Sequence, residues 1–256
     1  RYGKHASNLA ALIAYGLSQR LGIPSFIVDP VVVDELQSVA RISGNPKIER
    51  ISISHALNQK AIAQKMATSL GKRYDELNLI VAHLGGGISV GAHQKGRIID
   101  VNQALSGEGP FSPERVGSVP TAGLVGYFFD HNLTKADLMK EFVGQSGLVA
   151  HLGTNDSRDI VLRMEQGDQQ ALFYYDAMCY QIAKEIGRIS TVLCGIVDQI
   201  VLTGGLAYSS ELVMRVKERV EFIAPVTAIP GENELEALAL GALRVLTDQE
   251  EGLIYA

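Results

Sequence analysis

The sequence predicts an α/β fold, and two observations carry that prediction. Helical patterns alternate along the chain with short apolar strand patterns, as in folds whose helices cover a largely parallel sheet. Two apolar strands that lie far apart in the chain end in glycine turns, "IVAHLGGG" at 80–87 and "IVLTGG" at 200–205. Because ligands of α/β sheets bind at the carboxyl ends of strands, the two glycine turns are expected to flank one crevice.

The individual elements follow from the spacing of their apolar residues. Repeats of three to four residues predict helices, and short apolar runs bounded by polar residues, glycine or proline predict strands. The helices are expected at 7–22, 56–73, 168–194, 210–224 and 233–246. The strands are expected at 24–30, 78–85, 87–93, 96–102, 198–205 and 226–230, with 87–93 and 96–102 antiparallel.

The composition is that of an ordinary globular protein and excludes two classes of partner. Hydrophobic residues make up 46% and charged residues 20% of the 256 residues, enough for a large core. The net charge of −5 and the lack of a basic patch argue against a nucleic-acid partner. The longest uncharged run, 116–129, is shorter than the ~20 apolar residues of a membrane span, so no membrane partner is expected.

The two cysteines, Cys179 and Cys194, bear on the cellular compartment. Both lie in apolar helical pattern, and one helix holding both would separate them by ~22 Å, too far for a disulfide. We therefore expect reduced, buried thiols. Because no secretory signal pattern is present either, a cytoplasmic location is expected.

The triple glycine at 85–87 allows two interpretations. Two strands joined by glycines form a plain β-hairpin, which needs no ligand. Glycines with positive φ can also aim several backbone N–H groups into one concavity, which suits a phosphate. The motif is neither the Rossmann fingerprint nor the Walker loop, because no helix follows it.

Several segments together resemble the butyrate kinases, which belong with acetate kinase to the acetokinase family. The strongest are "AHLGGGISVGA" at 82–92, "LTGGLAYSSEL" at 202–212 and "PGENELEALALGALRVL" at 230–246. "KHASN" at 4–8, "ISISHALNQ" at 51–59 and "GEGPFSPERVGSVP" at 107–120 fit the same family, in the same order. The likeness runs from end to end of the chain.

The resemblance implies a fold, cofactors and a domain division. The fold is a pair of actin-like, ribonuclease H-like ATPase domains. Residues 1–30 would be the end of the first domain, 31–232 the second, nucleotide-binding domain, and 233–256 a helix that returns to the first. In the family a further N-terminal segment of roughly a hundred residues carries a phosphate-gripping turn and a substrate-binding arginine, and neither is in this sequence. The implied cofactors are ATP and Mg²⁺, and a homo-oligomer is expected for the full-length protein.

A carboxylate kinase transfers the γ-phosphoryl group of ATP to a carboxylate, which is already ionised at pH 7 and needs no general base. The resemblance therefore gives Asp29 a role in holding the metal's water shell or orienting the phosphoryl group, beside a plain turn-residue interpretation. The resemblance implies that Arg115 stabilises the charge of the transition state; the alternative is an ordinary surface arginine. His55 and His83 would donate to the same group or be structural. The family's transition-state histidine could also correspond to Ile51.

The resemblance likewise assigns nucleotide-binding residues. The first glycine turn would cradle the phosphates, the second would let the nucleotide lie flat, and the segment "GTNDSRDI" would contact adenosine. The implied nucleotide-binding residues are Gly85, Gly86, Gly87, Asp156, Arg158, Gly204 and Gly205.

The remaining assignments concern the substrate and the metal. His5 and Asn8, three residues apart, would share a helix face toward the substrate, although Asn8 could simply cap the helix. Glu234 resembles the magnesium-linked glutamate of acetate kinase, with Glu232 and Glu236 as alternatives. A glutamate that interacts with the helix dipole is the plain interpretation.

The resemblance implies an ATP- and Mg²⁺-dependent kinase that converts butyrate to butanoyl phosphate. Its partners would be a small carboxylate and an adenine nucleotide. Acetate or propionate kinase activity is the alternative within enzymes. A catalytically inactive nucleotide-binding fragment is the alternative from a different class.

Overall fold

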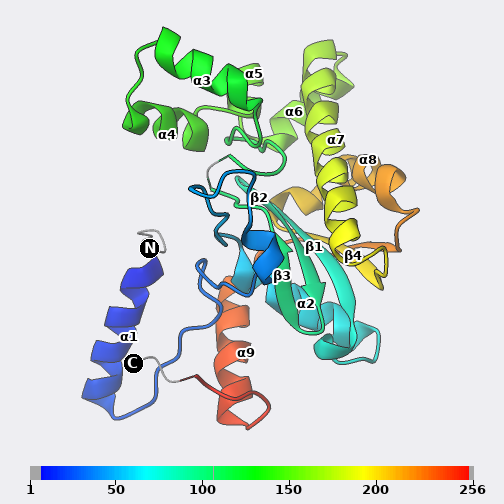
Figure 1. Ribbon diagram of the computed structural model, residues 1–256. Helices are drawn as coiled ribbons and strands as arrows, with labels where there is room; N and C mark the ends of the chain where they lie inside the picture. Colours follow the sequence, from blue (N-terminus) through cyan, green and yellow to red (C-terminus); the bar gives the residue numbers. More distant parts are fainter. Residues whose placement is uncertain (1–6, 106, 254–256) are drawn as a thin grey trace.

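A five-stranded mixed sheet forms the centre of the protein (Figure 1). The computed structural model describes residues 7–105 and 107–253, with side chains from residue 9 onward. The strand order is β3-β2-β1-β4-β5, with β1 antiparallel to β2, β2 antiparallel to β3, and β4 parallel to both β1 and β5. The strands are β1 (Asn78–Leu84), β2 (Ile88–Gln94), β3 (Arg97–Val101), β4 (Gln199–Thr203) and β5 (Val226–Ala228).

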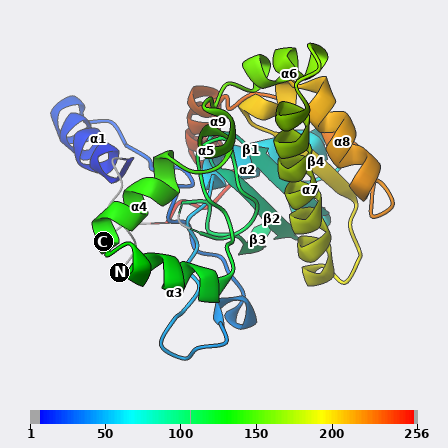
Figure 2. The same cartoon turned by 90° about the horizontal axis from the view of Figure 1, so that it is seen from above.

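Helices cover both faces of the sheet, which explains why β1 and β4 are apolar along most of their length. Side chains of β1 alternate between the faces. Leu79 and Val81 join a core with α2 (Ala56–Ser69), whereas Ile80 and Ala82 join the larger core with α7 (Gln169–Val192). Figure 2 shows the sheet between these helices.

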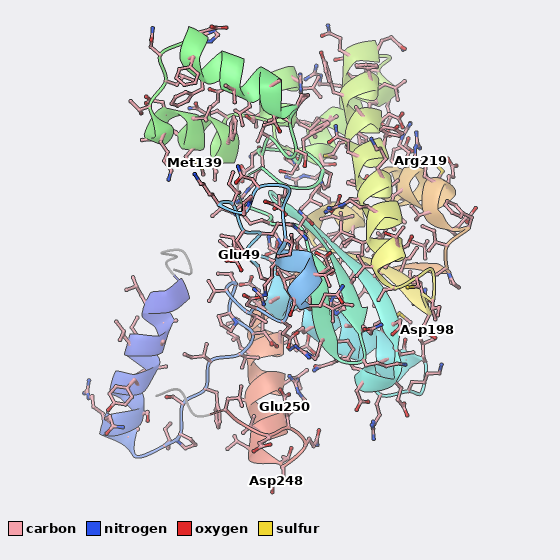
Figure 3. All side chains as sticks on the ribbon, viewed as in Figure 1. Glu49, Met139, Asp198, Arg219, Asp248 and Glu250 are labelled. Atoms are coloured by element: carbon pink, nitrogen blue, oxygen red, sulfur yellow. The ribbon has the colours of Figure 1, made fainter. Side chains whose placement is uncertain are left out.

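The parallel pairing of β1 and β4 is set by a side chain at their shared start. Asp198, labelled in Figure 3, accepts a 2.8 Å hydrogen bond from the backbone N–H of Asn78 through its carboxylate and donates its own backbone N–H to the Asn78 carbonyl. Leu79 then lies opposite Gln199, and His83 lies opposite Thr203. This register brings the ends of both strands to one edge of the sheet.

The other helices surround this centre. Helix α8 packs along α7, where Arg219, labelled in Figure 3, forms a 3.1 Å ion pair with Asp176. Helix α9 lies beside α2, and α1 stands apart from the sheet in both views (Figures 1 and 2). The α-helices are α1 (Ser7–Leu21), α3 (Thr121–Asp130), α4 (Lys135–Gly144), α5 (Leu148–Leu152), α6 (Ser157–Glu165), α8 (Ser210–Val220) and α9 (Glu234–Leu246). The 3₁₀ turns are η1 (Ser38–Arg41), η2 (Tyr74–Glu76) and η3 (Gly205–Tyr208).

The predicted α/β class is confirmed, but two local predictions are wrong. Residues 24–30 form no strand, because no described strand lies beside them to share backbone hydrogen bonds, and Ile27 stays half exposed. The long helix ends at Val192, before Cys194. Cys194 takes a left-handed conformation, with φ of 55°, and is exposed rather than buried. Cys179 is buried as expected, and both thiols are free.

The expected domain division at residues 30 and 232 stays a prediction. Segment 23–30 and α9 do contact one another: a Cβ at Gly241 of α9 would lie 2.4 Å from a Val28 methyl group. Among the described helices, none is both long and apolar enough to cross a bilayer.

Candidate active site

The two glycine turns lie at the same edge of the sheet. Gly85–Gly87 joins β1 to β2, and Gly204–Gly205 follows the neighbouring strand β4. Residues from both turns line one cleft of about 1070 Å³, which confirms the expectation of a shared crevice. The cleft is also lined by Glu114, Asp156, Arg158, Glu165, Glu211 and Glu232.

The first glycine turn is a hairpin, as one interpretation held, but its glycines have a different reason from the one expected. None of Gly85, Gly86 and Gly87 has a positive φ. Neighbouring groups approach them closely: a Cβ at Gly86 would lie 2.8 Å from a Glu114 carboxylate oxygen, and one at Gly87 would lie 3.2 Å from both the Ala104 carbonyl oxygen and Arg115 Nε. The hairpin thus makes room for the loop that carries Arg115.

The backbone N–H groups of this turn divide into two kinds. Gly85 donates to the carbonyl of Gly87 at 3.2 Å, inside the hairpin. Gly86 and Gly87 have no backbone acceptor for their N–H groups among the described residues. Of these two, Gly86 is exposed and lines the cleft, so its N–H is available to an anion there.

The second turn also contains two different glycines. Gly204 has a φ of 87°, and a Cβ there would lie 2.4 Å from the Leu84 carbonyl oxygen, so this position serves the junction of β1 and β4. At Gly205 a Cβ would meet nothing within 4 Å, and the residue lines the cleft. Of the pair, Gly205 is the one that a nucleotide could approach.

His55 and His83 form a stacked pair beside the first turn, with ring centroids 3.9 Å apart and an interplanar angle of 15°. His55 precedes α2, and His83 lies in β1. Burial, aided by the Arg115 charge, lowers the pKa of His55 to about 4, and burial beside His55 holds the pKa of His83 well below its usual value. Both rings are neutral at pH 7.

Acid should destabilise the protein through these histidines and through His93, whose burial lowers its pKa to about 3. Each folded-state pKa lies below the ~6.5 of an unfolded histidine, so below about pH 6.5 the unfolded chain binds more protons. The urea midpoint is therefore expected to fall as the pH is lowered from 7 to 5. His93→Gln should flatten this dependence, whereas His131→Asn, at an exposed histidine at the end of α3, should leave it intact. A midpoint that stays constant over this range would contradict the assignment.

Arg115 presents a guanidinium group without a carboxylate partner among the described residues. Its backbone N–H donates to Ser112 Oγ at 3.1 Å, and its Nη1 donates to the Ala104 carbonyl at 3.3 Å. Its Nε is buried and has no hydrogen-bond partner. Burial lowers the pKa of Arg115 while the neighbouring Glu114 opposes the shift, and the group stays charged. This half-buried, incompletely bonded cation against Gly87 suits a phosphoryl oxygen.

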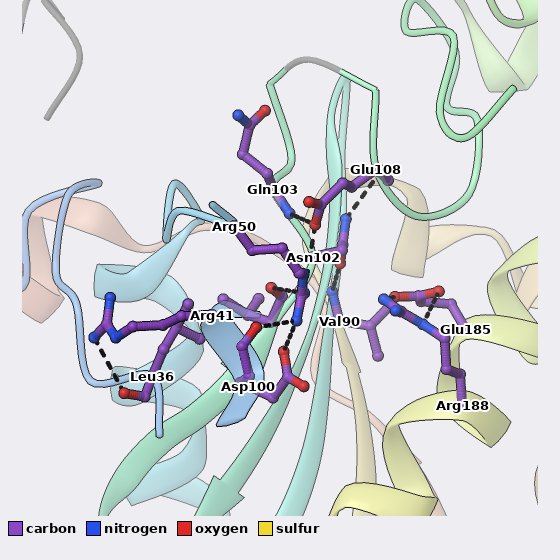
Figure 4. A network of polar contacts seen from close by, with 12 residues as sticks. Leu36, Arg41, Arg50, Val90, Asp100, Asn102, Gln103, Glu108, Glu185 and Arg188 are labelled. Carbon is purple, nitrogen blue, oxygen red and sulfur yellow. Dashed lines mark hydrogen bonds and ion pairs between the residues drawn. The ribbon is translucent and has the colours of Figure 1, made fainter. Parts of the chain in front are cut away.

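An ion-pair network holds the chain that leads to Arg115 (Figure 4). Arg50 donates to the Asp100 carboxylate at 3.0 Å and to the Val101 carbonyl at 3.1 Å, and pairs with Glu108 at 3.4 Å. Glu108 in turn accepts from the backbone N–H of Gln103 at 3.0 Å. Both ends of the loop between β3 and Glu108 are therefore tied to β3, which fixes the start of the segment that ends at Arg115.

Asp29 lies in a different cavity from the glycine turns. It has a left-handed backbone, with φ of 39°, and its carboxylate lies 3.1 Å from Lys60 Nζ, which Glu35 also binds at 3.0 Å. Burial raises the pKa of Asp29 against the effect of Lys60. Its cavity, of about 960 Å³ between α2 and α9, shares Glu232 with the glycine cleft. The predicted role of Asp29 in phosphoryl transfer stays a prediction.

Asp156 and Arg158 lie on the cleft, as expected for residues near a nucleotide. Asp156 caps α6 by accepting the backbone N–H of Arg158, and its carboxylate also binds the Arg158 guanidinium at 2.6 Å. These hydrogen bonds lower the pKa of Asp156 to about 2. The Arg158 side chain is 92% exposed, so a ligand in the cleft can reach it. Their contact with adenosine stays a prediction.

The structure separates the three candidate glutamates. Glu234 is exposed and lines neither cavity, whereas Glu236 lines only the cavity of Asp29. Glu232 lines both, and its carboxylate lies 4.0 Å from His83 Nε2. No group of three metal-binding side chains occurs in the described part of the chain. Glu232, weighed only as an alternative, is therefore the glutamate beside the histidines and the glycine turn.

The substrate residues fall outside what the structure describes. His5 precedes the described residues, and Asn8 is described only as a backbone position of α1.

Four site residues were missed by sequence reasoning. Asn58 and Gln59 in the "HALNQ" segment are 3% and 0% exposed, and both bond to histidines. Ser89 hydrogen-bonds His55, and Glu114 lies against Gly86. Two adjacent amides in the apolar pattern of α2 were the available signal, because such side chains are buried only when bonded.

Comparison with known proteins identifies the family. Residues 48–229 match the Acetokinase family. The chain belongs to the acetokinase family. The acetate kinase of Porphyromonas gingivalis has the same fold, with a TM-score of 0.81 and 20% identity over 93% of this chain and 69% of that one. A propionate kinase from Francisella tularensis has a TM-score of 0.75 and 19% identity, over 91% of this chain and 68% of that one. The acetate kinase of Entamoeba histolytica has a TM-score of 0.72 and 15% identity, over 83% of this chain and 62% of that one. The acetokinase α/β ATPase fold expected from the sequence is confirmed.

Proposed function

We propose that this acetokinase-family protein is a carboxylate kinase that transfers the γ-phosphoryl group of ATP to butyrate, forming butanoyl phosphate and ADP. The observation that carries the proposal is Arg115: its guanidinium lies against Gly87 of the first glycine turn and lacks a carboxylate partner among the described residues. Phosphoryl transfer concentrates charge on the transferred group's oxygens, and a preorganised cation stabilises that charge.

The cleft supports an adenine nucleotide as the phosphoryl donor. The N–H group of Gly86 would hold a phosphate oxygen, and Gly205, which lines the same cleft, would leave room for the nucleotide. Arg158 and Asp156 lie on the same cleft and would contact adenosine. The acceptor carboxylate is ionised at pH 7, so the reaction needs no general base.

Mg²⁺ would be held by the nucleotide phosphates and by Glu232. Mg²⁺ in such sites keeps several waters and takes only one or two protein carboxylates, so a single glutamate beside the cleft fits its needs. The ion supplies positive charge that neutralises the phosphate oxygens. Glu114 and Glu232 are among several glutamates that line the cleft, and their negative charge would repel a nucleotide without bound Mg²⁺.

Butyrate is proposed as the acceptor from the likeness of the glycine-turn and Arg115 segments to butyrate kinases, with acetate or propionate as alternatives. The test is hydroxamate formation by the purified full-length protein with ATP, Mg²⁺, hydroxylamine and each carboxylate in turn. Butyrate should give the highest kcat/KM. Faster turnover of acetate or propionate would reassign the substrate, and ATP binding without hydroxamate from any carboxylate would reject the kinase.

Glu232→Gln should raise the Mg²⁺ concentration needed for half-maximal activity by about tenfold, because it removes the carboxylate that faces the cleft. Glu234→Gln is the matched control: it makes the same chemical change at an exposed residue that lines neither cavity, and its Mg²⁺ requirement should stay normal. The measurement is initial rate against free Mg²⁺ at saturating ATP. A selective effect of Glu234→Gln would return the metal role to that residue.

A further inference from the structure

The stacked histidines rest on a buried hydrogen-bond network whose proton positions can be worked out. A neutral imidazole donates from one nitrogen and accepts at the other, and its neighbours decide which. The network contains donors and acceptors of fixed type, so the assignment follows from counting protons rather than from ring geometry. The tautomer assignment does not depend on the proposed kinase activity; only the roles given to the two rings in phosphoryl transfer rest on it.

Asn58 sets the proton position of His83. The Asn58 amide nitrogen donates to two backbone carbonyls, of Gly231 at 3.3 Å and Glu232 at 3.0 Å. Carbonyls accept only, so this orientation of the amide is forced, and Asn58 Oδ1 must face His83 Nδ1 at 2.8 Å. An amide oxygen accepts only, so His83 carries its proton on Nδ1 and exposes a bare Nε2.

A longer chain sets the proton position of His55. Gln59 Nε2 donates to the Ser89 carbonyl at 3.1 Å, which fixes the Gln59 amide, and also to Ser89 Oγ at 2.7 Å. Ser89 is fully buried, so its hydroxyl proton needs an acceptor, and His55 Nδ1 at 2.8 Å is the one within reach among the described residues. His55 therefore accepts at Nδ1 and carries its proton on Nε2.

The far end of this chain is equally determined. With its amide fixed, Gln59 accepts at Oε1 from His93 Nε2 at 3.0 Å. His93 Nδ1 then accepts from the Tyr74 hydroxyl at 2.6 Å. Gly91 of β2 leaves space for this arrangement, because a Cβ there would clash with Gln59 Oε1, only 2.4 Å away. Each of these side chains thus has a partner, as a buried network requires.

We propose that Asn58 on one side, and Ser89 held by Gln59 on the other, fix the stacked histidines in opposite tautomers, with His55 a hydrogen-bond donor at Nε2 and His83 an acceptor at Nε2. His55 Nε2 has no partner among the described residues and can donate to an oxygen of the transferred phosphoryl group. His83 Nε2 faces the Glu232 carboxylate at 4.0 Å and can accept from water or a hydroxyl group. Asn58, Gln59 and Ser89 are thus positioning residues.

Opposite tautomers would leave only one donor in the pair, whereas the sequence-based expectation had both histidines donating or being structural. In the neutral state only His55 has a proton on the nitrogen that its network partner leaves free. Two cations stacked at 3.9 Å would repel each other, whereas two neutral rings do not. Burial lowers the pKa of both rings, which favours the neutral forms that this arrangement requires at pH 7.

The test is long-range ¹H–¹⁵N correlation of the histidine rings in the protein at pH 7 without ligand. We expect a protonated Nε2 and a bare Nδ1 for His55, and the reverse for His83. The same tautomer on both rings, or a charged ring at pH 7, would overturn the proposal.

Two single-site variants then test which residue controls which ring. Ser89→Ala should turn the His55 signals into a tautomer mixture and leave His83 unchanged, whereas Asn58→Ala should do the reverse. Tyr74→Phe, which also deletes one hydroxyl but at the distant end of the chain, should leave both rings as in the unaltered protein. Amide spectra report whether each variant is folded, and a folded Ser89→Ala with an unaltered His55 would refute the role of Ser89.

Kinetics separate this inference from the proposed reaction. In the active enzyme, Ser89→Ala should lower kcat about tenfold with a smaller change in the KM for ATP, because the donor is misplaced while the cleft remains. If the tautomers are as assigned but no carboxylate is phosphorylated, only the proposed function fails. If the kinase is active and the tautomers differ, only the present inference fails.

Discussion

Arg115→Ala is expected to lower kcat for acyl phosphate formation by about a hundredfold or more, equivalent to about 3 kcal/mol of transition-state stabilisation. Arg115 reaches the glycine turn with a guanidinium whose Nε is buried and unbonded, so the protein has already desolvated a cation there. Such a group gains most when charge develops on the phosphoryl oxygens, which is an effect on kcat more than on the KM for ATP.

Two controls make the result specific to the guanidinium. Arg115→Lys keeps the charge but loses the planar fork, and should recover only a small part of the rate. Arg158→Ala, at an exposed arginine that lines the glycine cleft, should raise the KM for ATP more than it lowers kcat. A folded Arg115→Ala protein with near-normal kcat would return Arg115 to a structural role.

Gly204→Ala is expected to lower the free energy of unfolding by about 3 kcal/mol or more. The backbone there has a φ of 87° and a ψ of 177°, a region that costs a residue with a side chain about 1–3 kcal/mol, and the new methyl would lie 2.4 Å from the Leu84 carbonyl oxygen. Backbone atoms of β1 cannot move aside without disturbing a strand that pairs on both edges, so an overpacking cost of about 1–3 kcal/mol adds to the strain.

Gly205→Ala is the matched comparison, because it adds the same methyl one residue later, where nothing lies within 4 Å. Urea denaturation should show nearly unchanged stability for Gly205→Ala, while its affinity for ATP should weaken because the methyl points into open space beside the cleft. Equal stability losses in the two variants would show that the close approach to Leu84 is not what requires glycine at 204.

The central sheet could be predicted from the sequence because burial on both faces leaves a local pattern. The run 78–85 matches β1, Asn78–Leu84, and the run 198–205 contains β4, Gln199–Thr203. Segment 24–30 has the same apolar character but forms no strand, since a strand depends on a hydrogen-bonded neighbour that composition does not reveal. Cys194 was misplaced for a similar reason: the left-handed end of α7 falls inside an apolar pattern.

The candidate site divides in the same way. The sequence led to both glycine turns, to Arg115 and to both histidines, and the structure gathers the turns and the histidines near one sheet edge. The sequence could not show that Glu232, rather than Glu234, lies beside His83. The two glutamates are only two residues apart near the start of α9, but they have different surroundings. The sequence also could not reveal Ser89 as the partner of His55, which lies 34 residues away in the chain.

By itself the sequence determined the α/β class, the order of the elements and the positions where strands end in glycine. These depend on periodicity and on residue types that act locally. Only the tertiary structure decided why glycine is required at 204, since the backbone of Leu84 occupies the space that a side chain would take. It also decided which side chains face the Nδ1 atoms of His55 and His83, because folding brings Ser89 and Asn58 to them from other elements.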